Sequence, residues 1–373
     1  MKTLDAELLN ALTANSDAPC LSIYLPVHSS VAASNLDTLA LKNMVKDIRT
    51  HAAAHDTETL MKLLAPVEQY LNSKEFVRET NGTLAIFSSA KLFETVILPE
   101  NIPSAFYIDE CFYLLPLLDF ASNNKSFQVL ALGKNHVRLF EGNRYGLEEI
   151  QLDNSIPNTM KEALGYDLTD NHLHASAGGS AAIHGYMEIT DERDTDNTRF
   201  FRIIDQEINE RYSKPQKLPL ILAALPENHS LFQSISKNEC LQQHFISLNA
   251  DRIDKAQLHS RALELLDQQQ SEAIAKQLAR YTSAKAEQLA TDDVADIARH
   301  AMDSRIERLF LSEGMTMAGT VSVAERKIKP QESSAGDIIN RIALLTYKQG
   351  GYIHTLPQNN AKLPSGIGSI NRF

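Results

Sequence analysis

The residues best suited to chemistry lie in one stretch of the chain, between Asp153 and Asp196, which has little hydrophobic periodicity. Its centre carries two adjacent glycines, Gly178 and Gly179, followed by Ser180. Glycine permits positive φ and has no side chain, so such a pair lets the backbone approach another molecule closely. A non-periodic segment of this length is uncommon inside a compact domain and is usually functional or mobile. We therefore expect this loop to be the working end of the molecule, with a plain surface turn as the alternative.

Aromatic and imidazole rings flank the two glycines. The rings belong to His172, His174, His184 and Tyr186. Such rings can stack on, or hydrogen-bond to, unpaired RNA bases. The three histidines can also be drawn as a zinc site, and the acids between Glu188 and Asp196 as further metal ligands. No cysteine lies near them and no H-E-x-x-H motif occurs, which disfavours a metal-dependent hydrolase. Surface histidines without a special role are the alternative to RNA contact.

A second group of candidate residues lies on a helix predicted within residues 36–54, where apolar residues recur at roughly helical spacing. Lys42, Lys46 and Arg49 follow one another at spacings of four and three, which places them on one helix face. Such a face can contact RNA phosphates. Asp47 lies among them, and a solvated face without a partner is the alternative.

Signatures of small-molecule catalysis are missing from the sequence. It contains no G-x-S-x-G nucleophile motif, no Walker loop and no dinucleotide fingerprint. A nuclease of the ribonuclease H type needs carboxylates on its early strands, and the strand expected at Phe127 to Leu132 has none. We therefore expect a binding protein without enzymatic activity, metal or cofactor.

Composition limits the partners and the compartment. The chain has 373 residues and a net charge of −11, whereas proteins that bind nucleic acid nonspecifically are usually basic. We expect local, shape-based recognition if RNA is bound, and no binding to DNA. The three cysteines, Cys20, Cys111 and Cys240, are far apart and odd in number, which indicates buried thiols in a reducing compartment. No run approaches 18 apolar residues and the N-terminus lacks a signal-peptide pattern, so we expect a cytoplasmic protein without membrane contact.

The order of predicted elements indicates an α/β (α+β) protein of three domains, at residues 1–124, 125–255 and 256–373. For the first domain we expect strands at residues 20–26, 83–88 and 92–98 and helices at 36–54 and 57–72. For the second we expect strands at residues 127–132, 137–140 and 147–152, a loop at 171–196, a helix from Asn197, a strand at 219–225 and a helix after Pro226. This second pattern resembles the ribonuclease H arrangement.

The third domain is expected to be a small α/β sandwich. Its predicted elements are helices at residues 260–289 and 334–349 and strands at 306–311 and 352–356. Thr291 is a candidate cap for a further helix. The G-I-G run at residues 366–368 looks like part of a tail.

Several segments, in order along nearly the whole chain, resemble bacterial relatives of the archaeo-eukaryotic release factors. The matching runs are SIYLP at 22–26, LKNMVKDIR at 41–49, LAIFSS at 84–89, FYLLPLLDF at 112–120, VLALGKNHVRLFEGNR at 129–144, RFFRIID at 199–205, IERLFLSEG at 306–314 and YIHTLP at 352–357. Each run alone is weak, but their shared order makes the resemblance specific. It implies an N-terminal sheet domain, a ribonuclease H-like middle domain and an L7Ae-like C-terminal domain, as in release factor one and Pelota.

The same resemblance implies a function. Proteins of this family imitate a tRNA in the ribosomal A site, from the decoding centre to the peptidyl-transferase centre. The implied partners are the 70S ribosome, through 16S and 23S rRNA, and elongation factor Tu or a related translational GTPase, as in Balon-like hibernation factors.

The chain departs from the release factors at the residue after the two glycines. Release factors carry Gly-Gly-Gln, whereas this sequence reads Gly178-Gly179-Ser180, and serine has no amide to place water near the ester carbonyl. We therefore expect ribosome occupancy in hibernation or rescue without catalysis. A peptidyl-tRNA hydrolase that acts without the glutamine, or a metal-dependent hydrolase, is the alternative.

Overall fold

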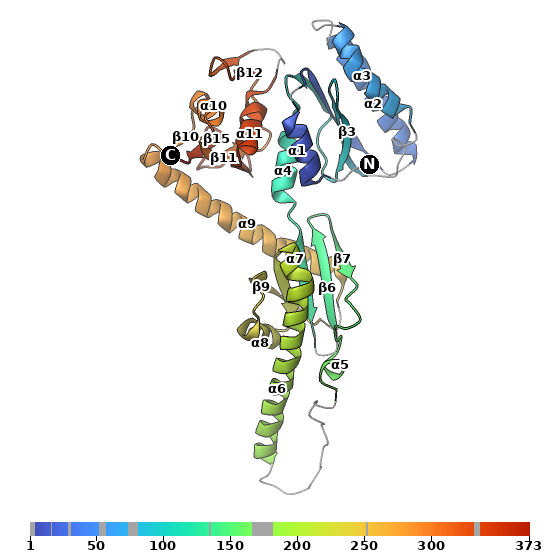
Figure 1. The fold of residues 1–373 in the computed structure, drawn as a ribbon, viewed down its shortest axis with the longest axis vertical. Helices are drawn as coiled ribbons and strands as arrows, with labels where there is room; N and C mark the ends of the chain where they lie inside the picture. Colours follow the sequence, from blue (N-terminus) through green and yellow to red (C-terminus); the bar gives the residue numbers. More distant parts are fainter. Residues whose placement is uncertain are drawn as a thin grey trace. The chain divides into compact units, whose positions relative to one another are not determined.

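The computed structural model describes residues 4–15, 17–28, 31–51, 57–73, 81–133, 136–165, 182–250, 253–331 and 336–373. The chain forms two compact units (Figure 1). One combines Met1–Asn123 with Ile274–Phe373, and the other is Asn124–Ala273. The mixed α/β fold expected from the sequence is confirmed, while the three domain boundaries stay a prediction.

The first unit begins with a four-stranded antiparallel sheet in the order β3-β2-β1-β4. Its strands are β1 (Cys20–Val27), β2 (Gly82–Ser88), β3 (Phe93–Leu98) and β4 (Ala105–Asp109). Successive residues of a strand point to opposite sides. Along β1, Leu21 and Ile23 join one buried cluster, and Cys20 and Tyr24 join another. The sheet is therefore covered on both faces.

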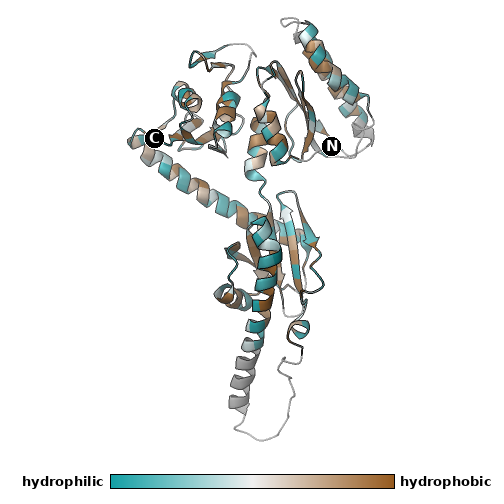
Figure 2. Ribbon diagram, viewed as in Figure 1, coloured by the Kyte–Doolittle hydropathy of each residue, from teal (hydrophilic) through white to brown (hydrophobic). Residues whose placement is uncertain are grey.

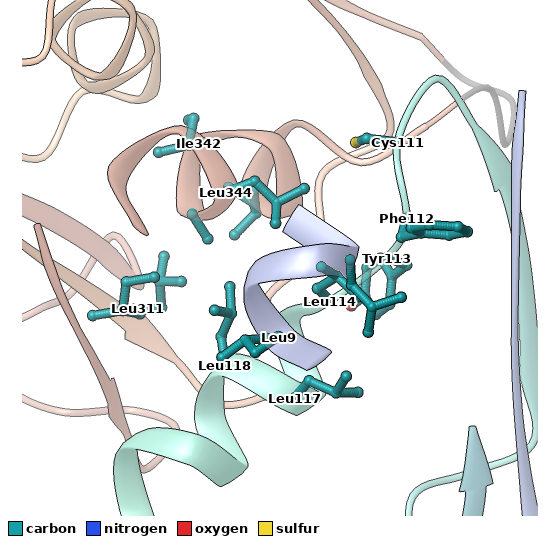
Figure 3. Packing of buried hydrophobic residues seen from close by; sticks show 14 of the residues in the cluster. Leu9, Cys111, Phe112, Tyr113, Leu114, Leu117, Leu118, Leu311, Ile342 and Leu344 are labelled. Atoms are coloured by element: carbon teal, nitrogen blue, oxygen red, sulfur yellow. The ribbon is translucent and has the colours of Figure 1, made fainter. Parts of the chain in front are cut away.

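Helices provide this cover. On one face lie α2 (Val31–His51) and α3 (Thr57–Leu71), which bury residues such as Leu41, Ile48 and Leu64. On the other face lie α1 (Ala6–Ala14) and α4 (Leu115–Asn123). Figure 3 shows Leu9 of α1 beside Leu117 and Leu118 of α4 in this second cluster.

The second cluster continues into residues 274–373, so both ends of the chain contribute to one core. After residue 289, the described residues of this part include a four-stranded sheet in the order β10-β15-β11-β14, a hairpin and short helices. These elements are β10 (Ala290–Thr291), α10 (Val294–Met302), β11 (Ile306–Ser312), β12 (Gly319–Ser322), β13 (Lys327–Pro330), α11 (Ile338–Lys348), β14 (Tyr352–Leu356) and β15 (Ile367–Asn371). Leu311, Ile342 and Leu344 pack in the shared core (Figure 3).

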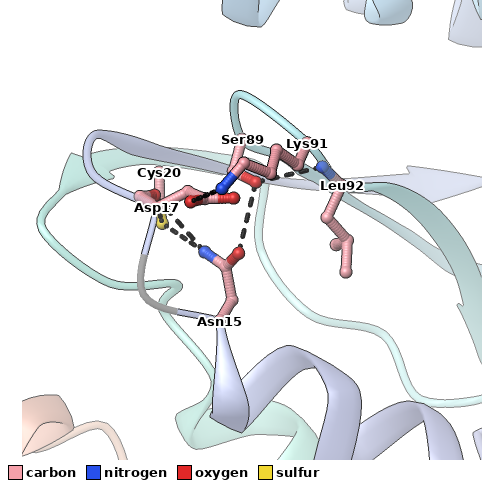
Figure 4. Close-up of polar contacts among 6 residues, drawn as sticks. All are labelled: Asn15, Asp17, Cys20, Ser89, Lys91 and Leu92. Atoms are coloured by element: carbon pink, nitrogen blue, oxygen red, sulfur yellow. Dashed lines mark hydrogen bonds and ion pairs between the residues drawn. The ribbon is translucent and has the colours of Figure 1, made fainter.

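A small polar network fastens the turn that follows α1 (Figure 4). The side-chain amide of Asn15 donates to Sγ of Cys20 at 3.1 Å, and its oxygen accepts from Oγ of Ser89 at 3.4 Å. Lys91 forms an ion pair with Asp17 at 3.0 Å. Burial raises the pKa of the Cys20 thiol to about 12, so this thiol stays protonated and unreactive at neutral pH. Cys20 and Cys111 are buried free thiols, as the sequence suggested, whereas Cys240 is half-buried.

The second unit is built on a five-stranded sheet in the order β7-β6-β5-β8-β9. The strands are β5 (Phe127–Leu132), β6 (Val137–Asn143), β7 (Gly146–Ile150), β8 (Leu220–Ala224) and β9 (Leu241–Ser247). The first three are antiparallel to one another, and β5, β8 and β9 run parallel. Three antiparallel strands followed by two parallel ones is the arrangement expected for a ribonuclease H-like domain.

Both faces of this sheet are covered by helices. On one face lie α6 (Ala182–Ile208) and α8 (Pro226–Ile235), and on the other lies the first part of α9 (Lys255–Ala286). The central strand β5 is buried along its whole length, because it has strand neighbours on both sides and helices on both faces. In Figure 2, α9 carries both teal and brown residues, as expected of a helix with one buried side.

The structure corrects several expectations. Helix α6 begins at Ala182 instead of near Asn197, so the end of the loop predicted at 171–196 is helical. Asp293, not Thr291, caps α10, because its side chain accepts from the N–H of Asp296. Ile367 and Gly368 of the G-I-G run begin the buried strand β15, so the run is not part of a tail. Strand β9 was not predicted. No helix among the described residues is long and apolar enough to span a membrane.

Candidate functional site

The chain enters the Gly-Gly loop through a fixed turn after β7. The carboxylate of Asp153 accepts hydrogen bonds from the N–H of Ser155 at 2.9 Å and from its hydroxyl at 2.6 Å. These bonds hold the pKa of Asp153 below its ordinary value. Arg211 lies 3.4 Å from the same carboxylate, and the N–H of Asp153 donates to the hydroxyl of Tyr212 at 3.1 Å. The turn is therefore tied to the segment that follows α6.

A short helix, α5 (Met160–Leu164), carries the chain to the loop. Its N-cap, Thr159, accepts from the N–H of Glu162 at 3.1 Å, and the carboxylate of Glu162 accepts from the N–H of Asn158 at 2.8 Å. This reciprocal capping stabilises the first turn of a helix. The helix ends at Gly165, whose φ of 53° suits glycine. The entry side of the loop is thus defined up to Gly165.

The exit side of the loop is held by the second half of α6. Phe200, Phe201 and Ile204 are fully buried against the sheet. Asp205 accepts hydrogen bonds from the hydroxyl of Ser236 and, at 2.8 Å, from the N–H of Lys237. These bonds fasten α6 to the turn before β9. Asp196, the last of the acids that precede Asn197, is also buried here and is 5% exposed.

Most of the predicted loop residues lie outside the described part of the chain. His172, His174, Gly178, Gly179 and Ser180 belong to residues 166–181. His184 and Tyr186 lie in α6, where only the backbone is described. The roles assigned to these residues stay predictions. What the structure adds is the frame, because the loop leaves one fixed element and returns into another.

Lys42, Lys46 and Arg49 all lie on the exposed side of α2, as predicted. Lys42 and Lys46 form no ion pair with any residue that the structure describes. Arg49 differs, because it is already paired with Glu68 of α3. Two of the three cations are therefore available to an anionic partner.

Metal ligation finds no support in the described ranges, which contain no group of three or more His, Cys, Asp or Glu side chains that could hold a metal ion. The histidine cluster named above is not part of those ranges, except for the backbone of His184.

A cavity of about 630 Å³ lies in the second unit, beside β9 and between α8 and α9. No sequence pattern indicated this cavity, because β9 was not predicted and a cavity forms only where separate elements meet. Its lining includes His229 of α8, Phe245 of β9 and Arg261 of α9.

A known protein family matches the part of the chain that contains this geometry. Residues 126–305 match bacterial archaeo-eukaryotic release factor family 3. The matched range includes the whole five-stranded sheet, both elements that frame the Gly-Gly loop, and the cavity beside β9. The resemblance inferred from the sequence motifs is thereby confirmed for this range, which includes the runs at 129–144 and 199–205. The comparison with curated proteins finds no match.

Solved structures of translation factors are similar at low identity. The archaeal termination factor aRF1 is 15% identical, with 99% of this chain and 97% of aRF1 covered and a TM-score of 0.25. Dom34 of S. cerevisiae, a termination-like factor that interacts with Hbs1, is 11% identical, with 78% and 73% covered and a TM-score of 0.37. Ribosome-bound archaeal Pelota is 8% identical, with 100% and 95% covered and a TM-score of 0.39. At these scores the likeness carries no argument about function.

Proposed function

We propose that this chain, whose residues 126–305 match the model of bacterial archaeo-eukaryotic release factor family 3, is a ribosome-binding factor that occupies the A site without catalysing peptide release. The observation that carries the proposal is the coincidence of the family match with the unit that frames the Gly-Gly loop. Both the fixed turn at Asp153 and the anchored half of α6 lie within the match. Loops that a rigid scaffold positions commonly carry binding residues.

Two surfaces support contact with rRNA. The predicted loop contact uses His172, His174, Gly178, Gly179, Ser180, His184 and Tyr186 at the peptidyl-transferase centre. The second contact uses Lys42 and Lys46 of α2, whose exposed ammonium groups can meet 16S rRNA phosphates. These two lysines form a local positive site on a chain whose net charge is −11. Binding to rRNA therefore depends on where the lysines lie more than on attraction between the whole chain and the phosphates.

The absence of catalysis follows from Ser180. A serine at this position offers a hydroxyl on a single carbon and cannot reach or orient water as a glutamine amide does. Occupancy without release suits hibernation of idle ribosomes or rescue of stalled ones. By family resemblance, elongation factor Tu or a related GTPase is the protein partner that delivers the chain.

Co-sedimentation through a sucrose gradient tests ribosome binding. The purified chain should migrate with vacant 70S ribosomes at low and moderate salt, and should be displaced by a tRNA bound in the A site. A chain that stays at the top of the gradient under both salt conditions would contradict the proposal. Adding elongation factor Tu with GTP or GDP should increase the bound fraction in one nucleotide state.

A further inference from the structure

Strand β9 forms one edge of the five-stranded sheet in the second unit. Among the described strands of its sheet, β9 is the last and has a strand neighbour on one side only. Edge strands usually carry charges or proline that prevent pairing with other chains. The opposite edge, β7, follows this rule with Glu148 and Glu149, which pair with Lys255 and Arg138. The sequence of β9, LQQHFIS, has no charged residue and no proline.

The cavity beside β9 runs over this edge instead of over one face of the sheet. Phe245 packs with the cluster under α6 and α8, whereas Ile246 packs with the cluster under α9. Both residues nevertheless line the same cavity. His229 and Arg261, which belong to helices on opposite faces of the sheet, also both line it, and they can do so only around the edge of the sheet. Five consecutive residues, 243–247, line it, which corresponds to about 16 Å of extended chain.

The hydrogen bonds of β9 show which backbone groups face the cavity. The N–H of Leu248 donates to the carbonyl of Ala224 in β8. The backbone N–H and carbonyl groups of even-numbered residues at this end of β9 therefore face β8, and those of odd-numbered residues face the open edge. The carbonyl of Ser247 instead accepts from Arg261 of α9 at 2.8 Å, so it faces away from β8. Phe245 lies two residues before Ser247, so its backbone groups face the same way. Its N–H and carbonyl therefore face the open edge, where the described residues supply no partner for them.

Two side chains give the edge a chemical preference. His229 stacks flat on Phe245, with ring centroids 3.7 Å apart and planes 9° apart. Burial lowers the pKa of His229, so this ring pair is an uncharged flat surface at neutral pH. At the other end, Arg261 keeps guanidinium N–H groups beyond the one bound to Ser247, and it forms no ion pair with the residues that the structure describes. A carboxylate is the complementary partner for that group.

We propose that this edge binds an extended peptide segment of a partner protein by strand addition. The segment exchanges two backbone hydrogen bonds with Phe245, lays an apolar side chain against the His229–Phe245 ring pair, and places a carboxylate, from a side chain or a chain end, at Arg261. Main-chain bonds supply affinity and the flanking side chains supply specificity in this mode of recognition. This proposal holds whether or not the chain binds ribosomes, and none of the residues that line the cavity belongs to the Gly-Gly loop.

A phage-displayed library of random heptapeptides, screened against the full-length chain, tests the proposal. Selected peptides should carry an Asp, a Glu or a free C-terminus at a fixed distance from an apolar residue. Binding of a fluorescent copy should slow amide hydrogen exchange in residues 241–247. Recovery of no binding peptide, or protection confined to other segments, would overturn the proposal.

Charge reversal sharpens the test. Arg261→Glu should weaken binding of the acidic peptide by about tenfold or more, and replacing the peptide's acid by lysine should restore it. Lys276→Glu is the matched control, because Lys276 is exposed on the same helix and does not line the cavity, and it should leave affinity unchanged. Thermal unfolding of each variant shows that the fold persists. Equal loss in both variants, or competition by a single-stranded heptanucleotide, would show that the edge is not a peptide site.

Discussion

The side-chain oxygen of Asn340 accepts a hydrogen bond of 2.9 Å from the backbone N–H of Leu114, which lies 226 residues earlier in the chain. The amide nitrogen of the same side chain donates to the carbonyl of Phe112 at 3.0 Å. Asn340 is 1% exposed. One buried side chain of α11 therefore replaces a strand partner for the segment between β4 and α4, and it joins the N-terminal and C-terminal parts of the first unit.

Replacing Asn340 by alanine should destabilise the protein by about 2–4 kcal/mol. The substitution leaves a buried N–H and a buried carbonyl without partners, and each costs about 1–3 kcal/mol. Urea denaturation followed by circular dichroism measures the change. Asn43→Ala, on the exposed side of α2, is the control and should change stability by less than about 0.5 kcal/mol. Similar midpoints for the two variants would show that Asn340 does not join the two parts.

The contribution of Asp109 to stability should fall as pH rises from about 4 to about 6. Burial raises the pKa of Asp109 from its ordinary value of 3.8 to about 6. Between these values the folded chain holds a proton that the unfolded chain has released, so deprotonation costs stability as pH rises. Burial also raises the pKa of Asp337, which acts in the same direction.

Asp109→Asn should therefore stabilise the protein above pH 6 by about 1–2 kcal/mol and flatten the dependence between pH 4 and pH 6. The gain is less than the full shift implies, because asparagine keeps only one oxygen to accept from Glu110. Thermal unfolding at pH 4.5 and pH 8 measures both effects. A variant less stable than the wild type at pH 8 would mean that the lost acceptor outweighs the removed charge.

Reversal of two charges on α2 should weaken ribosome binding. Lys42→Glu with Lys46→Glu should lower the affinity for 70S ribosomes about tenfold or more and reduce its dependence on salt, because phosphate contacts release counterions. Lys276→Glu with Lys362→Glu makes the same change in net charge at exposed positions elsewhere and should bind nearly as the wild type does. If both double variants lose affinity equally, net charge and not the α2 surface governs binding.

The residue after the two glycines should decide whether the chain releases peptide. The wild type should leave peptidyl-tRNA intact on stalled ribosomes, because Ser180 has no amide. Ser180→Gln should raise release of labelled peptide above background, and Gly179→Ala added to that variant should abolish it. Release by the wild type, lost on Gly179→Ala alone, would support the hydrolase alternative.

Detachment of α6 from the turn before β9 should destabilise the second unit. Asp205→Ala removes the acceptor for Ser236 and Lys237 and should cost about 1–3 kcal/mol, as expected for charge-assisted hydrogen bonds. Hydrogen exchange in residues 200–208 should accelerate with it. Glu227→Ala, on the exposed side of α8, is the control and should leave exchange in that segment unchanged.

The parts of the fold that the sequence predicted are those whose local pattern agrees with their burial. β5, β6 and β8 are short apolar runs separated by turn residues, and α3 has a clear apolar stripe. β15 was missed because Gly368 and Ser369 read as a loop, although the strand is fully buried between β10 and β11. β9 was missed because it is an edge strand with two consecutive exposed residues, Gln243 and His244. They break the alternation of apolar and polar residues by which a strand is predicted.

Some features of the candidate site could be predicted from the sequence, and others could not. The glycine pair and the lysines of α2 could be found because residue type and spacing suffice to suggest them. The pairing of Arg49 with Glu68, and the approach of His229 to Phe245, depend on how separate elements pack. No spacing along the chain carries that information. Surfaces formed by a single element could therefore be predicted from the sequence, whereas surfaces formed by several elements could not.

The discontinuous first unit has a consequence for the order in which the protein is made. Its core needs Ile297, Ile338 and Ile353, which leave the synthesising ribosome only after residues 124–273 have followed the N-terminal part. At about 5–20 residues per second, synthesis of the intervening unit takes on the order of 10–30 s. During that interval the inserted unit can fold, while the face of the first sheet that carries Tyr24 and Phe87 still lacks its C-terminal cover. A nascent chain of this protein is thus a natural client for chaperones that shield apolar surface until the last residues emerge.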